Sequence, residues 1–101
     1  MEPGLQQLES SLAALCRQHQ VRALSIFGSA ARGATLANSD VDLLVEFQPG
    51  KAPSLAGFAR LKREFALALG VATVDLATPS ILRNPYRRRS ILMDLKQIYA
   101  A

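Results

Sequence analysis

The sequence predicts an α/β fold (α+β in arrangement), in which helices pack against a small mixed β-sheet. Two observations support this class. Apolar residues recur at helical spacing in some segments and form short strand-like runs in others, and the two kinds of segment alternate along the chain. The chain has 101 residues, half of them apolar, which suits one core of modest size. We therefore expect residues 1–101 to form a single domain.

The first expected elements are a helix over residues 4–19 and a strand over residues 21–27. Four leucines at a 3–4–3 spacing would share one side of that helix: Leu5, Leu8, Leu12 and Leu15. The next apolar run is too short for a helix and is rich in branched and aromatic residues, which is typical of a buried strand. Gly28 and Ser29 end this strand, and we expect them to open a short helix that continues to Arg32.

A loop over residues 34–39 should lead to a second strand over 41–47 and a turn over 48–50. Ser54 is a good N-cap and Gly70 a good C-terminal cap for the helix between them. Its expected apolar positions are Leu55, Phe58, Leu61, Phe65 and Leu69.

The remaining elements are a strand over residues 71–77, a helix and a short final strand. Asn84 followed by Pro85 is a typical helix start, and this helix should reach about residue 95 with Leu92 and Leu95 facing inward. Ile98 and Tyr99 can form the final strand.

Charge and cysteine content limit the possible binding partners and the cellular location of the protein. The formal net charge is +4 and the pI about 9.8, which fits polyanionic partners or simply a solvated basic surface. Direct nucleic-acid binding is disfavoured, because no basic stripe is interleaved with aromatic residues. The lone cysteine, Cys16, excludes an intrachain disulfide. With neither a signal peptide nor a membrane-length apolar stretch in view, we expect a cytoplasmic protein without membrane contact.

Three aspartates are the candidate catalytic residues. Asp40 and Asp42 stand two apart at the start of the second strand, so both carboxylates should point the same way. Such a pair repels itself unless a cation joins it, and a divalent cation that prefers oxygen ligands is the natural candidate. Asp75 would carry a third charge inside a buried strand. A helical crossover would make its strand parallel to the second one, bringing Asp75 beside Asp42.

Gly28 and Ser29 are the candidate phosphate-binding residues. The first turn of a helix offers free backbone N–H groups, and glycine lets a phosphate approach closely. If the first two strands are antiparallel, this turn lies beside the aspartates. Taken singly, a Gly-Ser pair is usually only a turn and an Asp-x-Asp pair usually a solvated loop. Three such carboxylates on one face, by contrast, suit two-metal phosphoryl transfer.

Residues 28–45 resemble the signature of the polymerase-beta-type nucleotidyltransferases, Gly-Ser-x-Ala-Arg-Gly followed by Ser-Asp-x-Asp-Leu. The short chain is similar to the minimal nucleotidyltransferases, the antitoxin partners of HEPN-domain toxins. The resemblance implies a nucleotidyltransferase fold and transfer of AMP from ATP to a hydroxyl, with a tyrosine of the toxin as one known acceptor.

The same resemblance implies a role for each motif residue. Asp40, Asp42 and Asp75 would bind two Mg²⁺ ions, and Asp75 would also help to activate the acceptor hydroxyl. Gly28 and Ser29 would hold the outer phosphates of ATP, while Arg32 and Gly33 would shape the loop. Two alternatives remain: a non-catalytic module that neutralises its partner by binding, and a small-molecule adenylyltransferase. The basic run from Arg87 to Arg89 could contact a phosphate or a partner, or form only a solvated helix face.

Overall fold

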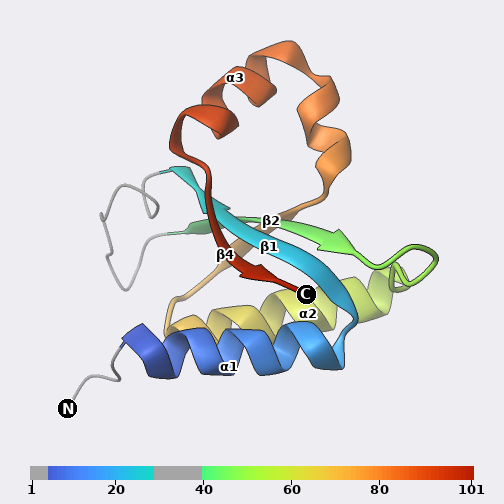
Figure 1. Ribbon diagram of the computed structural model, residues 1–101, viewed down its shortest axis with the longest axis vertical. Helices are drawn as coiled ribbons and strands as arrows, with labels where there is room; N and C mark the ends of the chain where they lie inside the picture. The colour runs from blue at the N-terminus through green and yellow to red at the C-terminus, as the bar shows by residue number, and fades with distance from the viewer. Residues whose placement is uncertain (1–4, 29–39) are drawn as a thin grey trace.

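A computed structural model describes residues 5–28 and 40–101, with side chains described from residue 10 onward. It confirms the α/β class (Figure 1). In chain order the elements are α1 (Leu5–Gln18), β1 (Val21–Phe27), β2 (Val41–Phe47), α2 (Leu55–Leu69), β3 (Val74–Ala77), the 3₁₀ helix η2 (Pro79–Arg83), α3 (Pro85–Asp94) and β4 (Lys96–Ala100).

The four strands form one mixed sheet in the order β3-β2-β1-β4. Strand β1 is antiparallel to both β2 and β4, and β2 is parallel to β3. The parallel pair follows from the connection between them, because α2 carries the chain back to the end of the sheet where β2 began. The expected parallel pairing of β2 and β3 is therefore confirmed, the antiparallel pairing of β1 and β2 that the sequence left open is observed, and β3 is an edge strand.

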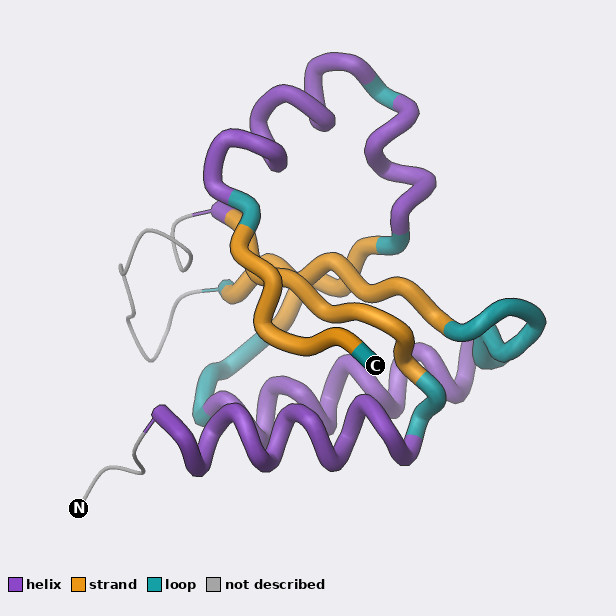
Figure 2. Tube along the Cα trace, viewed as in Figure 1, coloured by secondary structure: helices purple, strands orange, loops and turns teal. Residues whose placement is uncertain are grey.

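Helices α1 and α2 lie side by side over one face of the sheet (Figure 2). The alternation of side chains sends Val41, Leu43 and Val45 of β2 to this face. They meet Leu61 and Phe65 of α2, both fully buried. Burial of side chains of this size stabilises the fold by about 1.5–3 kcal/mol each. The residues between them in β2, Asp42 and Leu44, therefore face the opposite side of the sheet.

Both expected caps of α2 are confirmed. The Ser54 hydroxyl accepts a hydrogen bond from the Gly57 N–H at 3.2 Å. Gly70 has φ +69°, the left-handed conformation that glycine tolerates best, and its N–H donates to the Leu67 carbonyl. Together the caps fix where α2 begins and ends.

One polar contact and one buried side chain hold α1 against the rest of the fold. The His19 Nε2 and Glu64 Oε2 atoms lie 2.6 Å apart and join the C-terminal end of α1 to α2. Cys16 is fully buried, and this burial raises the pKa of its thiol to about 11. The thiol is thus protonated at neutral pH and acts as a small apolar side chain.

The 3₁₀ helix η2 and helix α3 lie over the other face of the sheet (Figure 1). Asn84 caps α3 as expected, its Oδ1 accepting from the N–H groups of Tyr86 and Arg87. The expected inward position of Leu92 is wrong, since this side chain is 47% exposed and Ile91 is buried instead. Three consecutive apolar residues give no helical periodicity, so packing alone chose among them. Leu95 caps the helix end and is half-buried.

Two strand boundaries and one additional helix differ from the sequence expectation. Strand β3 begins at Val74 rather than Val71, because the Val71 N–H donates to the Ala66 carbonyl and completes the end of α2. The 3₁₀ helix η2 was not expected. The final strand is longer than the Ile98–Tyr99 pair suggested. The short helix expected after Gly28 and the loop over 34–39 fall outside the described residues.

None of the helices in the described ranges has both the length and the apolar character needed to cross a membrane.

Candidate active site

Gly28 and Asp42 meet where the end of β1 lies beside the start of β2. Phe27 and Asp42 are cross-strand partners in the antiparallel register, and Gly28 follows at once. Gly28 has φ +74°, and a Cβ atom placed there would lie 2.5 Å from Oδ2 of Asp42. A side chain at position 28 would therefore force the Asp42 carboxylate to move, whereas glycine leaves it in place. The sequence expectation that the glycine turn lies next to an aspartate therefore matches the structure.

Asp75 lies next to Asp42 in the parallel register of β2 and β3. Because side chains alternate along both strands, the two carboxylates lie on the same face of the sheet, opposite α1 and α2. Asp75 was expected inside a buried strand and to need a partner for that reason. That premise is wrong: β3 is an edge strand and Asp75 is exposed, so water can solvate its charge.

Asp42 and Asp75 line one open cavity of about 530 Å³, a size typical of small-molecule sites. Its lining residues are Phe27, Asp42, Phe58, Asp75, Leu76, Ala77, Thr78, Ser80, Ile81 and Arg87. Most of the lining comes from the sheet on one side and from η2 and α3 on the other, and Phe58 of α2 also contributes. The segment that covers this face of the sheet therefore also forms a wall of the cavity.

The carboxylates repel one another. Partial burial raises the pKa of the Asp42 carboxyl above its ordinary value, and the charges of Asp75 and then Asp40 raise it further. The Arg87 guanidinium acts in the opposite direction. A cation bound between Asp42 and Asp75 would relieve this repulsion, and carboxylate oxygens are the ligands that Mg²⁺ prefers. The chemistry of this pair fits a divalent metal.

Asp40 takes a different position. It is exposed, directly precedes β2 and does not line the cavity, and its Oδ1 accepts a hydrogen bond from the Thr73 hydroxyl. Within residues 5–28 and 40–101, no three His, Cys, Asp or Glu side chains are grouped to hold a metal ion. The structure thus brings Asp42 and Asp75 together and engages Asp40 with Thr73 beside them. The other predicted site residues, Ser29, Arg32 and Gly33, lie outside the described residues.

The sequence did not show whether Arg87 contacts a ligand or lies on a solvated helix face. Arg87 lines the cavity together with both aspartates, whereas its neighbours Arg88 and Arg89 do not. One signal was present in the sequence, because a positive charge in the first turn of a helix opposes the helix dipole. This unfavourable charge indicated that the arginines could have a function, but it did not show which of the three would line the cavity.

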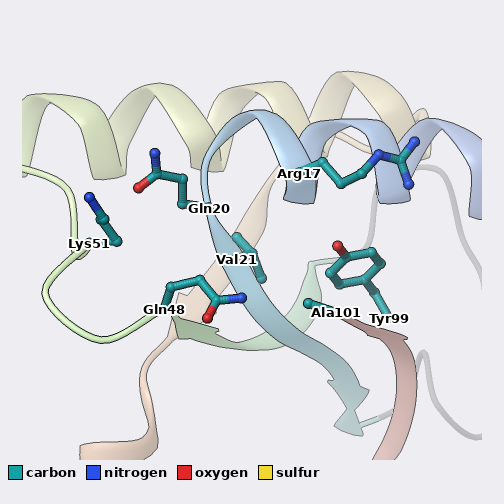
Figure 3. Close-up of a pocket in the computed structure, with 7 residues that line it drawn as sticks. All are labelled: Arg17, Gln20, Val21, Gln48, Lys51, Tyr99 and Ala101. Atoms are coloured by element: carbon teal, nitrogen blue, oxygen red, sulfur yellow. The ribbon is translucent and has the colours of Figure 1, made fainter.

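A second pocket, of about 480 Å³, lies by the start of β1 and the end of β4 (Figure 3). It is lined by Arg17, Gln20, Val21, Gln48, Lys51, Tyr99 and Ala101. Arg17 and Tyr99 lie on one side of β1, with Gln20 and Lys51 on the other. The lining contains cations and amides but no side-chain carboxylate, in contrast to the cavity lined by Asp42 and Asp75. The acidic chemistry belongs to the cavity beneath α3.

Comparison with known proteins points to one family. The family model described as a nucleotidyltransferase domain matches residues 8–98. The chain is 38% identical over 84 residues to the protein adenylyltransferase MntA of Thermococcus cleftensis, an alignment that covers 79% of this chain and 82% of the relative.

Solved structures agree with this likeness. A protein described as a minimal nucleotidyltransferase is 34% identical and superposes with a TM-score of 0.69, covering 91% of this chain and 90% of the other. An MNT antitoxin solved in complex with a tri-AMPylated HEPN toxin of Shewanella oneidensis superposes with a TM-score of 0.58 over 95% of this chain and 72% of the other. At 20% identity, this second likeness concerns the fold alone.

Proposed function

The chain belongs to the nucleotidyltransferase domain family as a minimal nucleotidyltransferase, and from that premise we propose that it transfers AMP from ATP to a hydroxyl of a partner protein. The observation that carries the proposal is the β2–β3 register, which sets Asp42 beside Asp75 in one cavity next to Gly28. A tyrosine of a HEPN-domain toxin is the proposed acceptor, and silencing that toxin the proposed outcome. The donor nucleotide and the reduced Cys16 thiol suit a cytoplasmic enzyme.

Each site residue has a proposed task. Asp42 and Asp75 hold Mg²⁺, joined by Asp40 once it releases Thr73, in a site for two ions. When bound, the metal makes the acceptor hydroxyl more acidic and neutralises charge on the triphosphate. Asp75, the more exposed of the pair, also helps to activate the acceptor hydroxyl. Gly28 and Ser29 bind the outer phosphates through backbone N–H groups, and Arg32 with Gly33 shapes their loop.

The proposed transfer forms one P–O bond and breaks another. The acceptor oxygen forms a bond to the α-phosphorus of ATP, and the bond from that phosphorus to the bridging oxygen breaks. Pyrophosphate leaves, and the hydroxyl proton passes through a carboxylate to water. The protein contributes mainly position and charge, as in other phosphoryl-group transfers.

The direct test is transfer of label from ATP carrying ³²P on the α-phosphate, with Mg²⁺ and the product of the gene that neighbours the one encoding this chain. The wild type should label that protein. Asp42→Ala should reduce the rate by about 10³-fold, since a lost metal ligand removes several kcal/mol of transition-state stabilisation. Glu46→Ala is the matched control, because Glu46 is an exposed carboxylate on the same strand that does not line the cavity.

The outcomes separate the alternatives. Undiminished labelling by Asp42→Ala would refute the catalytic assignment. A tight complex with the toxin that never becomes labelled would instead favour a module that neutralises its partner by binding. Labelling of a small molecule in cell extract, with the toxin left unlabelled, would move the acceptor to the small-molecule class.

A further inference from the structure

We infer that Arg87 is a substrate-binding residue that holds the phosphate groups of the donor nucleotide against the two cavity aspartates. This inference rests on the proposed function and names a contact that the nucleotidyltransferase signature over residues 28–45 does not contain. Arg87 belongs to α3, on the far side of the cavity from the sheet that carries Asp42 and Asp75. A ligand in the cavity would thus have carboxylates on one side and a guanidinium on the other.

The guanidinium shares the cavity with both aspartates and remains available to a ligand. Arg87, Asp42 and Asp75 all line this cavity, so a ligand inside it can meet all three side chains. Within the described part of the chain, however, no ion pair joins Arg87 to a carboxylate. The side chain is exposed, so its donors are open to a ligand entering the cavity.

The start of α3 holds Arg87 in place. The Asn84 side chain accepts a hydrogen bond from the Arg87 N–H at 3.3 Å, which fixes the first turn of the helix. A cation here opposes the helix dipole, so this position carries a small cost in helix stability. A bound anion would offset that cost, because it would interact favourably with both the guanidinium and the helix N-terminus.

The cavity chemistry selects the ligand. Arginine binds phosphate through two parallel hydrogen bonds, and Asp42 and Asp75 can bind the same phosphates only through a metal ion. The hydroxyls of Thr78 and Ser80 line the same wall, 3.0 Å from one another, and add neutral donors. A nucleoside triphosphate carrying Mg²⁺ matches this set of charges, whereas an uncharged nucleoside would leave Arg87 without a partner.

The test measures binding of ATP with Mg²⁺ to the purified full chain by calorimetry. Arg87→Ala should weaken binding by about 10-fold to 100-fold, the usual range for losing hydrogen bonds to a charged group. Arg87→Lys should recover part of the affinity, since lysine keeps the charge without the paired geometry. Arg88→Ala removes the same charge one residue away, outside the cavity, and should change the affinity by less than about 3-fold.

A transfer assay adds a second readout. The KM for ATP should rise in Arg87→Ala by a similar factor while kcat changes little. Arg87→Ala binding ATP as tightly as Arg88→Ala would overturn the inference, and if Arg87→Ala does not fold, Arg87→Lys with full wild-type affinity would do the same. Neither result would affect the proposed function, which fails separately if the wild type binds ATP but labels no acceptor.

Discussion

At the scale of single residues, the backbone conformation of Gly28 determines how much room the Asp42 carboxylate has. Gly28 adopts a left-handed conformation and lies so close to Oδ2 of Asp42 that a methyl group would displace the carboxylate. Gly50 adopts the same φ of +74°, but a Cβ atom at that position would meet nothing within 4 Å. The two glycines therefore share one conformational requirement, and only Gly28 adds a steric one.

Substitution of the two glycines should separate these requirements. Gly28→Ala and Gly50→Ala should each lower the free energy of unfolding by about 1–2 kcal/mol, the cost of a left-handed alanine. Gly28→Ala should in addition lower AMP transfer by about 10²-fold, because it moves Asp42. Urea denaturation and the labelling assay measure the two effects. Equal transfer rates in the two variants would show that the close approach to Asp42 has no catalytic role.

At the scale of elements, the two capped helices serve different faces of the sheet. Ser54 caps α2, which buries Leu61 and Phe65 in the main core. Asn84 caps α3, which buries only Ile91 among its own residues and contributes Arg87 to the cavity. Loss of either cap removes one side-chain acceptor from a helix start, but the functional consequence should differ.

Asn84→Ala and Ser54→Ala should each cost about 1 kcal/mol of stability, the usual effect of losing an N-cap. Asn84→Ala should also weaken ATP binding by a few-fold, about the change expected when the first turn of α3 frays for part of the time. Ser54→Ala should leave the affinity for ATP unchanged. Thermal unfolding and calorimetry give the two measurements, and an unaltered affinity in Asn84→Ala would mean that α3 is held by its packing rather than by its cap.

At the scale of the whole molecule, the sheet has one strongly buried face and one lightly covered face. The main core lies under α1 and α2 and includes Leu24, Leu43 and Phe65. On the opposite face η2 contributes no buried residue and α3 contributes one. The wall of the cavity is therefore attached to the sheet by much less apolar surface than the two long helices are.

This asymmetry predicts separate opening of the wall. Amides of residues 79–94 should exchange with solvent at a lower free energy than those of β1 and β2, because local stability follows local apolar burial. ATP with Mg²⁺ should slow their exchange if Arg87 binds the nucleotide. Hydrogen-exchange mass spectrometry at low denaturant would measure both effects. Exchange of this segment in step with β1 would show that the molecule unfolds as one unit.

Local patterns in the sequence determined much of this protein. Short-range periodicity and capping residues located the strands over 21–27 and 41–47 and both ends of α2. The helix between the strands that carry Asp42 and Asp75 predicted parallel neighbours, and therefore predicted that the two aspartates would lie side by side. The signature over residues 28–45 indicated the family. These features depend on neighbours in the chain, which is why they can be read without the fold.

Tertiary packing decided what local patterns could not. It buried Ile91 rather than Leu92. Three consecutive apolar residues point in three different directions from a helix, so the sequence alone does not show which of them faces the core. Packing also left Asp75 exposed on an edge strand, because strand order depends on contacts distant in sequence. It engaged Asp40 with Thr73, the residues that directly precede β2 and β3. It also brought Arg87, alone among three adjacent arginines, to the cavity. Each of these results depends on how segments distant in the sequence pack against one another. The residues of a single segment do not determine that packing.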